Sequence, residues 1–524
     1  MNLYKRLALL LLCFYGLSGN AQEGDIDVVH YDFQISLSDR SDIINGKAAI
    51  TISFGRESSQ FRLHLASVQE DKGMQAFLVR EQGDPAPLVF VHKDDRLLVQ
   101  LRKPTAKGER RTFEIEYMGI PRDGLIISRN KYGDRTFFSD NWPDRARQWL
   151  PCNDVPSDKA SVEFRIKAPA HYRVISNGDL VSETAMGEDK LTHWKETAPL
   201  PSKVMVIGVA RFAVARVDSA FRWPVTAWVY PQDSAKGFYD YALADDILRF
   251  FEGYIGPYPY RKLANVQSKT IFGGMENANA IFYAEATVTG TRQSEALLAH
   301  EIAHQWFGNT ATEESYAHLW LSEGFATYLT DVYIESKYGR DSFVNRLKEE
   351  RAEVIAFSRQ SKQPVVDSLS ALMELLNPNS YQKGAWILHM LRGEVGDDAF
   401  KEIIRAYYAR FKEGNANSRD FEAVAEKLAG RELGWFFKQW LHRPGVPMLQ
   451  LATKMNGEAL EIRIGQLTEP YRFDLEVQLT AADGTKHLER IAVTGKETVY
   501  RVKLKGPASV QFDPGTKLLF AEKR

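Results

Sequence analysis

Two histidines with the spacing of a zinc site stand near the middle of the 524-residue chain, in the segment His300-Glu301-Ile302-Ala303-His304. Residues four apart lie on the same face of an α-helix, so His300 and His304 can direct two imidazole nitrogens at one point. Glu301 is about 100° further round the helix. From there it can reach a water near the metal without being a ligand itself. The spacing predicts two zinc ligands and a general base.

A second segment supplies a third ligand, because Glu323 follows the second histidine after 18 intervening residues. Thr291 or Ser294 can cap the first helix and Gly308 can end it, and a second helix is expected over about 320–338. This second helix would bring Glu323 back past the first. Three protein ligands leave a fourth tetrahedral position open, as in a catalytic zinc site. The sequence therefore predicts one Zn²⁺ ion per chain.

An extended segment with two glycines, Gly273-Gly274-Met275-Glu276-Asn277, precedes the histidines. Glycines let a peptide backbone approach closely, so a substrate could pair with this segment as an additional strand. Glu276 could then form a charge-assisted hydrogen bond with a free α-ammonium group. Judged from the residues alone, Glu276 is more simply interpreted as a solvated residue of a strand. Tyr381, which lies further along the chain, is more simply interpreted as a packed residue of a helix.

Together these motifs resemble those of the zinc aminopeptidases of the M1 family. The resemblance covers most of the chain and is most specific between Tyr254 and Trp386. It implies a thermolysin-like catalytic domain that hydrolyses the first peptide bond with a metal-activated water. It also implies that Glu276 binds the amino terminus of the peptide substrate and that Tyr381 stabilises the oxyanion of the transition state.

The sequence departs from the family pattern at three places. The family usually has glutamine seven residues before the arginine that corresponds to Arg147, whereas this chain has Asp140 followed by Asn141. Either side chain could contact the substrate amine. The family often has glutamate seven residues after the third ligand, where this chain has Thr330. The large helical C-terminal domain of many relatives does not follow the last β-domain in this sequence, so we expect a more open cleft.

Three folded domains are expected from the length and the residue patterns. Period-two alternation broken by turn residues predicts a β-sandwich-like N-terminal domain over residues 22–217, with antiparallel strands. Helical periodicity and the zinc motifs place the thermolysin-like α/β and helical catalytic domain at 218–444, and further strand-like runs predict a small β-domain at 445–524. The expected fold class is multidomain α+β.

The N-terminus has the pattern of a secretory signal peptide. Lys5 and Arg6 precede an apolar run, and Gly19-Asn20-Ala21 supplies the small residues of a cleavage site. We therefore expect a signal peptide over residues 1–21, export to the periplasm or outside the cell, and no stable membrane insertion after cleavage. The formal net charge is −1 and no basic cluster stands out, so nucleic acid is not an expected partner.

Three functions remain compatible with the sequence. The first is an aminopeptidase, and the second is a zinc endopeptidase or another zinc hydrolase with an open cleft. The third is a catalytically silent protein that binds peptides. A free aminoacyl amide compared with its N-acetylated form separates the first two, and chelator-sensitive hydrolysis separates both from the third. The preferred N-terminal residue, the physiological substrate and the oligomeric state are left open.

Overall fold

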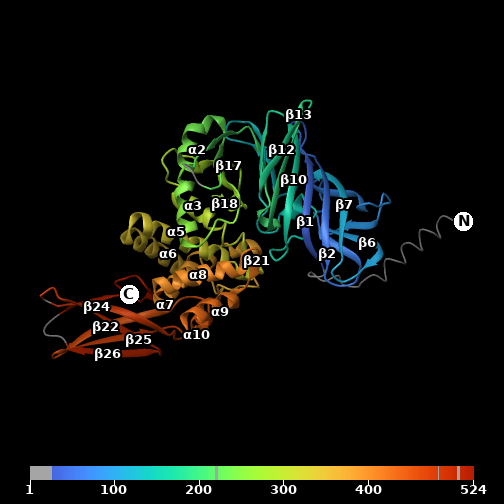
Figure 1. The fold of residues 1–524 in the computed structure, drawn as a ribbon. Helices are drawn as coiled ribbons and strands as arrows, with labels where there is room; N and C mark the ends of the chain where they lie inside the picture. The colour runs from blue at the N-terminus through green and yellow to red at the C-terminus, as the bar shows by residue number, and fades with distance from the viewer. Residues whose placement is uncertain (1–25, 219–221, 482, 504–507, 524) are drawn as a thin grey trace.

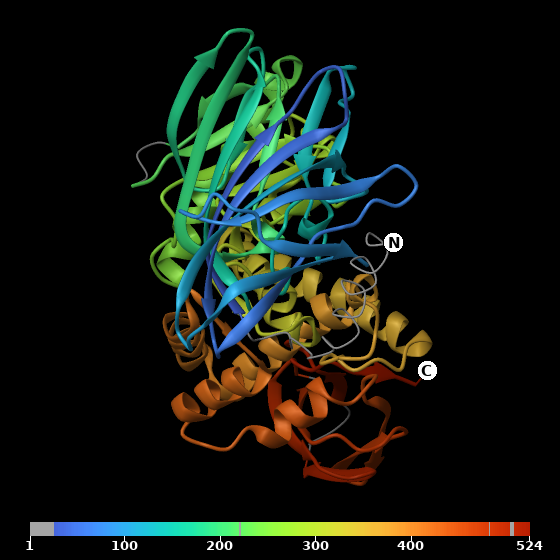
Figure 2. The ribbon, with the colours of Figure 1, turned by 90° about the vertical axis from the view of Figure 1, so that its right-hand side faces the viewer.

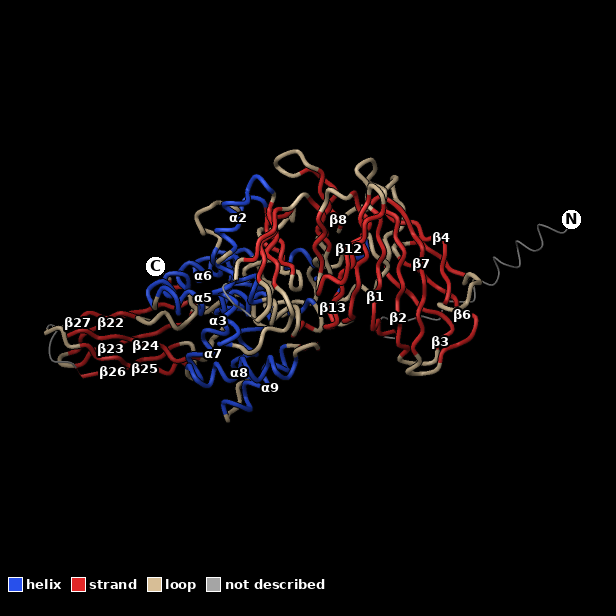
Figure 3. The backbone as a smooth tube through the Cα atoms, turned by 45° about the horizontal axis from the view of Figure 1, so that its top comes forward, coloured by secondary structure: helices blue, strands red, loops and turns tan. Residues whose placement is uncertain are grey.

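The computed structural model describes residues 26–218, 222–481, 483–503 and 508–523. In Figure 1 a mainly helical central part lies between a strand-rich N-terminal part and a strand-rich C-terminal part, and Figure 3 shows the same division with helices in blue and strands in red. The multidomain α+β class predicted from the sequence is confirmed. The predicted signal peptide, residues 1–21, lies outside the described residues.

The main sheet of the N-terminal domain has, within the described residues, seven strands in the order β12-β13-β10-β1-β2-β7-β4. Strand β2 buries every second residue against the core, which is the alternation that the sequence predicts for a half-buried strand. The strands are β1 (Ile26–Ser36), β2 (Ile44–Phe54), β4 (Gly73–Glu81), β7 (Arg110–Ile120), β10 (Lys159–Pro169), β12 (Asp179–Met186) and β13 (Asp189–Pro201).

The prediction of antiparallel strands throughout this domain is wrong at one pair. Strands β1 and β10 run parallel, with Phe33 opposite Phe164. The two rings stack at a centroid distance of 5.4 Å. A parallel pair needs a long crossover connection, and here the whole segment between β1 and β10 provides it.

Two smaller sheets complete the N-terminal domain. Their strand orders are β3-β6-β5 and β11-β14-β9-β8. Apolar residues of both sheets are buried in the same core as those of the main sheet. The strands are β3 (Ser58–His64), β5 (Val89–Lys93), β6 (Arg96–Thr105), β8 (Leu125–Arg129), β9 (Arg135–Ser139), β11 (Arg173–Ser176) and β14 (Ile207–Ala210).

The central part contains a mixed sheet in the order β15-β16-β17-β19-β18. All residues of β17 are buried, as expected for a strand covered on both faces. Strand β18 lies at the edge, antiparallel to β19. An edge strand has backbone groups available for pairing with another chain. The strands are β15 (Ala213–Arg216), β16 (Val225–Val229), β17 (Leu263–Ser268), β18 (Gly274–Met275) and β19 (Ala280–Ala284).

Helix α5 is the buried centre of the helical region, and every residue from Trp320 to Ile334 is buried. Its observed bounds confirm the predicted second helix. None of the described helices combines the length and the apolar character needed to cross a membrane. The helices are α2 (Ser234–Tyr241), α3 (Leu243–Tyr254), α4 (Glu295–Ala303), α5 (Trp320–Tyr338), α6 (Arg340–Gln360), α7 (Gly384–Val395), α8 (Asp397–Phe411), α9 (Ser418–Ala429) and α10 (Gly434–Leu441).

The C-terminal β-domain packs against the last helices of the central part (Figure 2). Its described strands form two sheets, in the orders β26-β23-β22-β28 and β25-β24-β27. Two buried side chains hold this junction: His389 of α7 is bonded to the Thr516 carbonyl, and Lys383 donates to the carbonyls of Arg443 and Gly445 in the segment between α10 and β22. The strands are β22 (Met448–Asn456), β23 (Ala459–Gln466), β24 (Phe473–Ala481), β25 (Lys486–Val493), β26 (Glu497–Lys503), β27 (Ala508–Phe512) and β28 (Ala521–Glu522).

Candidate metal centre and substrate cavity

The ends of helix α4 differ in detail from the prediction. Ser294 occupies the N-cap position, but its hydroxyl donates to the Thr287 carbonyl at 3.0 Å and makes no capping bond. The helix ends at Ala303, well before Gly308. His304, the next residue, keeps a right-handed helical conformation. The two histidines therefore still lie on one helical face, which is what the predicted metal site requires.

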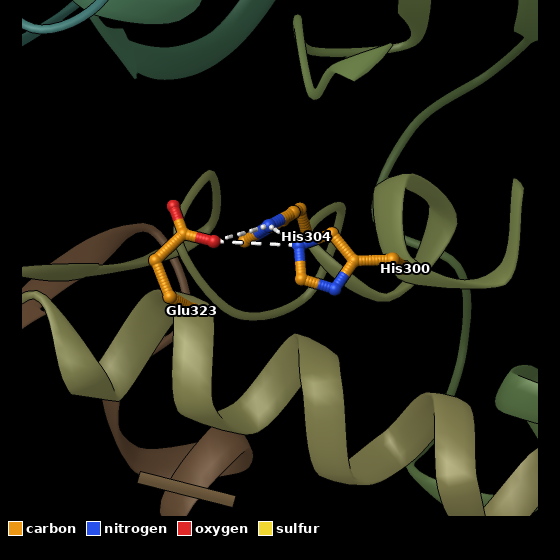
Figure 4. A group of neighbouring side chains, drawn as sticks. All are labelled: His300, His304 and Glu323. Atoms are coloured by element: carbon orange, nitrogen blue, oxygen red, sulfur yellow. Dashed lines mark hydrogen bonds and ion pairs between the residues drawn. The ribbon is translucent and has the colours of Figure 1, made fainter. Parts of the chain in front are cut away.

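Three side chains from α4 and α5 converge on one point (Figure 4). Glu323 Oε2 lies 3.3 Å from Nε2 of His300 and 3.3 Å from Nε2 of His304. The two Nε2 atoms are 3.1 Å apart. Ligands held tetrahedrally at about 2.0–2.1 Å from zinc are roughly 3.3–3.4 Å apart. This triangle therefore fits a single small divalent cation.

Hydrogen bonding and charge both prepare the triangle for a cation. The carbonyl of Phe307 lies 3.1 Å from His304 Nδ1, and because a carbonyl can only accept, Nδ1 carries a proton and Nε2 is the nitrogen that can bind a metal ion. Burial lowers the pKa of His304, but Glu323, Glu276 and Glu301 together raise it to about 10. The site thus holds an excess of carboxyl groups that a divalent cation would neutralise.

Glu301 lines the same cavity but is not one of the converging residues. Its carboxyl group lies against the backbone of Gly274 in β18. Burial raises the pKa of Glu301 well above its usual range, His304 opposes the shift, and Glu276 adds to it. A carboxyl group in this environment can accept and return a proton near neutral pH.

The carboxyl group of Glu276 is buried, with 5% of the residue exposed, so the solvated interpretation is wrong. Its Oε1 atom has no hydrogen-bond partner in the described part of the chain, and the residue lines the cavity. The backbone carbonyl of Glu276, in contrast, accepts from Gln305 Nε2 at 2.9 Å and Asn309 Nδ2 at 2.7 Å. A buried acid held in this way can receive a cationic group from a ligand.

Gln305 and Asn309 are positioning residues that the sequence interpretation missed. Both follow the second histidine, and both are fully buried. A signal was present, since they are amides in a run that also contains the core residues Trp306 and Phe307. Buried amides need hydrogen-bond partners, and here part of that need is met by the segment that carries Glu276.

The other residues of the glycine-containing segment differ in whether they line the cavity. Gly273, Gly274 and Met275 line it together with Glu276. Asn277 does not line it, and its side chain is buried without a hydrogen-bond partner among the residues described here. The segment thus presents its backbone at the edge of the sheet and one acid to the cavity.

Tyr381 lies in a π-helical turn, Asn379–Lys383, that precedes α7. The residues alone favour an ordinary helix position for Tyr381, and the π-turn corrects that interpretation. The ring of Tyr381 lies 6.0 Å from the ring of His300 at an interplanar angle of 15°. Burial raises the pKa of Tyr381 well above its usual value, so the phenol is a neutral hydrogen-bond donor.

Asp140 and Asn141 do not line the cavity, which contradicts the prediction that one of them contacts a substrate amine. Asp140 is fully buried and accepts from Arg145 at 2.6 Å and from Thr270 at 2.9 Å. Asn141 accepts from the Trp149 indole and donates to a backbone carbonyl. Their polar groups are already used to hold this loop, whereas the next residue, Trp142, does line the cavity.

Thr330 also lines the cavity, but its hydroxyl donates to the Ala326 carbonyl of its own helix at 2.8 Å. The cavity has a volume of about 470 Å³. Residues from β18, α4, α5, α6 and the π-turn form its walls, so metal ligands, Glu301, Glu276 and Tyr381 all face one space.

Two family models match the chain. The Peptidase M1 N-terminal domain matches residues 28–204, and the Peptidase family M1 domain matches residues 239–440. The chain belongs to peptidase family M1. The second match contains the converging residues, Glu276 and Tyr381, so the M1 assignment and the cavity geometry concern the same part of the molecule.

Several relatives of this M1 chain are similar over most of its length. Aminopeptidase M1-C of Oryza sativa subsp. japonica is 25% identical over 448 residues, covering 81% of this chain and 50% of the relative. Probable aminopeptidase 2 of Sulfurisphaera tokodaii is 26% identical over 416 residues, which cover 75% of this chain and 52% of the relative. Glutamyl aminopeptidase of Rattus norvegicus is 25% identical over 460 residues, which cover 82% of this chain and 48% of the relative. The chain thus spans about half the length of these curated relatives.

Proposed function

We propose that this M1 chain is a zinc-dependent aminopeptidase that removes the first residue from peptides. One observation carries the proposal: Glu276 holds a buried carboxyl oxygen that has no partner among the described residues, in the cavity that contains the converging histidines and Glu323. A free peptide amine is a cation that would pair with this oxygen, whereas an internal peptide bond offers none. The names of the curated relatives support the same activity.

The metal site would be formed by His300, His304 and Glu323, whose ligand atoms lie within 4.8 Å of one another. A zinc ion bound there would supply Lewis acidity, which polarises a carbonyl and lowers the pKa of water. The donor set of two imidazoles and one carboxylate is typical of catalytic zinc. The proton on His304 Nδ1 keeps its Nε2 available for this role.

Proton transfer is assigned to Glu301. It lies beside the converging residues, and its buried carboxyl group can take the proton of the attacking water. It then passes this proton to the leaving amine, acting first as a general base and then as a general acid. The raised pKa of Glu301, caused mainly by burial, suits the second half of that cycle.

Substrate orientation is assigned to β18, Glu276 and Tyr381. As an edge strand, β18 can pair with the peptide backbone, and Glu276 fixes the terminal amine so that the first peptide bond reaches the metal centre. The neutral phenol of Tyr381 can donate to the developing oxyanion.

The test compares fluorogenic aminoacyl amides with free and N-acetylated amines, each with and without a chelator and after zinc is restored. We expect the free amine to be hydrolysed about ten- to a hundredfold faster, which is the effect of one hydrogen bond between charged groups. Equal rates for both forms would indicate an endopeptidase or another zinc hydrolase. Binding without any hydrolysis would indicate a silent peptide-binding protein.

A further inference from the structure

The loop of residues 276–279, which we call the Glu276 loop, joins β18 to β19 and carries the acid that lines the cavity. Its last three residues are each no more than 1% exposed. A buried loop must find hydrogen-bond partners for its backbone groups. Gln305 provides some of them, since it donates to the Glu276 carbonyl and its Oε1 accepts from the Asn279 N–H at 2.7 Å. Further partners come from the N-terminal domain.

Both backbone polar groups of Ala278 are bonded to the N-terminal domain. Its carbonyl accepts from Asn177 Nδ2 at 2.7 Å, and its N–H donates to the Val204 carbonyl at 3.2 Å. Asn177 lies in the turn between β11 and β12 and is 1% exposed. The same Nδ2 donates to the Val204 carbonyl at 3.0 Å, and Oδ1 accepts from the Val206 N–H at 2.7 Å. One buried amide thus connects the Glu276 loop to the segment that precedes β14.

Asn279 ends the loop in a conformation that needs support. Its φ of 51° lies in the left-handed region, which asparagine adopts more readily than most residues with a side chain. Its Oδ1 accepts from the Gly178 N–H at 2.8 Å, and its Nδ2 donates to Glu196 Oε2 at 2.8 Å. Both partners belong to the N-terminal domain, while Lys262 of the catalytic domain also donates to Oδ1. The end of the loop is therefore held from both domains.

We propose that Asn177 is a positioning residue for recognition of the substrate amine, acting through Ala278 on the carboxyl group of Glu276. This inference rests on the proposed aminopeptidase function. Hydrogen bonds weaken steeply with distance and misalignment, so a displaced Glu276 loop would lose its bond to an amine. No hydrogen bond of the Asn177 side chain within the described part of the chain reaches α4 or α5, so the metal site would stay in place. The N-terminal domain thereby takes part in selecting peptides with a free amine.

The test compares leucine hydroxamate with 4-methylpentanohydroxamate, which lacks only the α-amine. Both present the same metal-binding group, so the ratio of their dissociation constants reports amine binding, and calorimetric titration of the zinc-loaded chain measures it without turnover. We expect leucine hydroxamate to bind the unaltered chain at least about tenfold more tightly, as for one hydrogen bond between charged groups. Asn177→Ala should lower this ratio to about two. Zinc content and the affinity for 4-methylpentanohydroxamate should not change.

Asn130→Ala is the matched control. Asn130 is also a buried asparagine in a turn of the N-terminal domain, and its Oδ1 accepts from the N–H groups of Tyr132 and Asp134 in its own turn, both at 2.9 Å. This variant should keep the ratio of the unaltered chain. Asn177→Asp keeps the size and the acceptor for Val206 but removes the donor to Ala278. It should also lower the ratio, and it provides the test if Asn177→Ala fails to fold.

A full ratio in the Asn177 variants would overturn the proposal. Weaker binding of both compounds by the same factor would also overturn it, because a purely structural role affects them equally. A ratio near one in the unaltered chain would remove amine recognition by Glu276 itself, and the proposed function and this inference would then fall together.

Discussion

Gly274 and Glu301 are in such close contact that a Cβ atom on Gly274 would lie 2.3 Å from Glu301 Oε1. The Glu301 side chain therefore occupies the space that a side chain at position 274 would need. The proposed general base is held in place by backbone as well as by its own helix. Gly273 differs, since a Cβ there would meet the Leu297 side chain at an ordinary 3.8 Å.

The substitution Gly274→Ala should displace the Glu301 carboxyl group and lower kcat by roughly a hundredfold, the effect expected of a shift of about 1 Å in a reacting group. Zinc content should stay at one ion per chain, because none of the ligands is moved directly. Steady-state kinetics measure kcat, and elemental analysis measures the zinc content. Gly273→Ala is the matched control and should retain most of its activity. Equal kcat in both variants would contradict the contact.

Glu301→Gln should keep the zinc ion and lose turnover. The amide has nearly the same size but cannot accept a proton, so kcat should fall by roughly a hundred- to ten-thousandfold. Metal content and substrate affinity should change little. Elemental analysis and single-turnover kinetics provide the measurement, and near-normal kcat in this variant would remove the assigned role.

Glu276→Gln should reduce kcat/KM for substrates with a free amine by about ten- to a hundredfold, because a charged acceptor is lost from a buried position. Hydrolysis of the N-acetylated form, already slow, should hardly change. The measured quantity is the ratio of the two rates. A ratio that stays at its original value would show that the amine is bound elsewhere.

Lys383 is a candidate positioning residue for Tyr381, two residues away in the π-turn. It is fully buried, burial lowers its pKa to about 7, and its Nζ donates to the carbonyls of Arg443 and Gly445. We expect Lys383→Met to lower kcat by roughly tenfold through a misplaced phenol, with KM little changed. Lys438→Met, an exposed position on α10, is the control. A rise in KM alone would argue against positioning.

His389 should make stability depend on pH. Its Nε2 donates to the Thr516 carbonyl and its Nδ1 accepts from Tyr328, and burial lowers its pKa to about 3. In the unfolded chain its pKa is about 6.5, so between these values the unfolded state binds more protons. The free energy of unfolding should have its full value above pH 6.5 and should fall by up to roughly 4–5 kcal/mol as the pH drops to 3.

Melting temperatures measured between pH 4 and 7 check this dependence. His389→Asn should show a shallower decline toward acid pH than the unaltered chain. His64, whose pKa burial also lowers to about 3, remains in both proteins, so the difference in slope reports His389. Parallel curves would contradict the prediction.

The parts of the site that the sequence predicts are those fixed by local geometry. The i, i+4 spacing of His300 and His304 sets their direction on any helix, and the apolar pattern fixes α5, which carries Glu323. Features that depend on distant segments could not be predicted. The environment of Asp140 is made by Thr270, 130 residues away, and the parallel pairing of β1 with β10 also joins separated parts of the chain.

The aromatic ring of Trp142 belongs to the β-rich N-terminal part, yet it forms one side of the cavity and meets Tyr316 edge to face at a centroid distance of 5.9 Å. A fragment starting at residue 218 would contain every ligand for the metal but lack this side. It would also expose large apolar rings to water, which is a common cause of aggregation. Attempts to produce a minimal enzyme should therefore retain the first half of the chain.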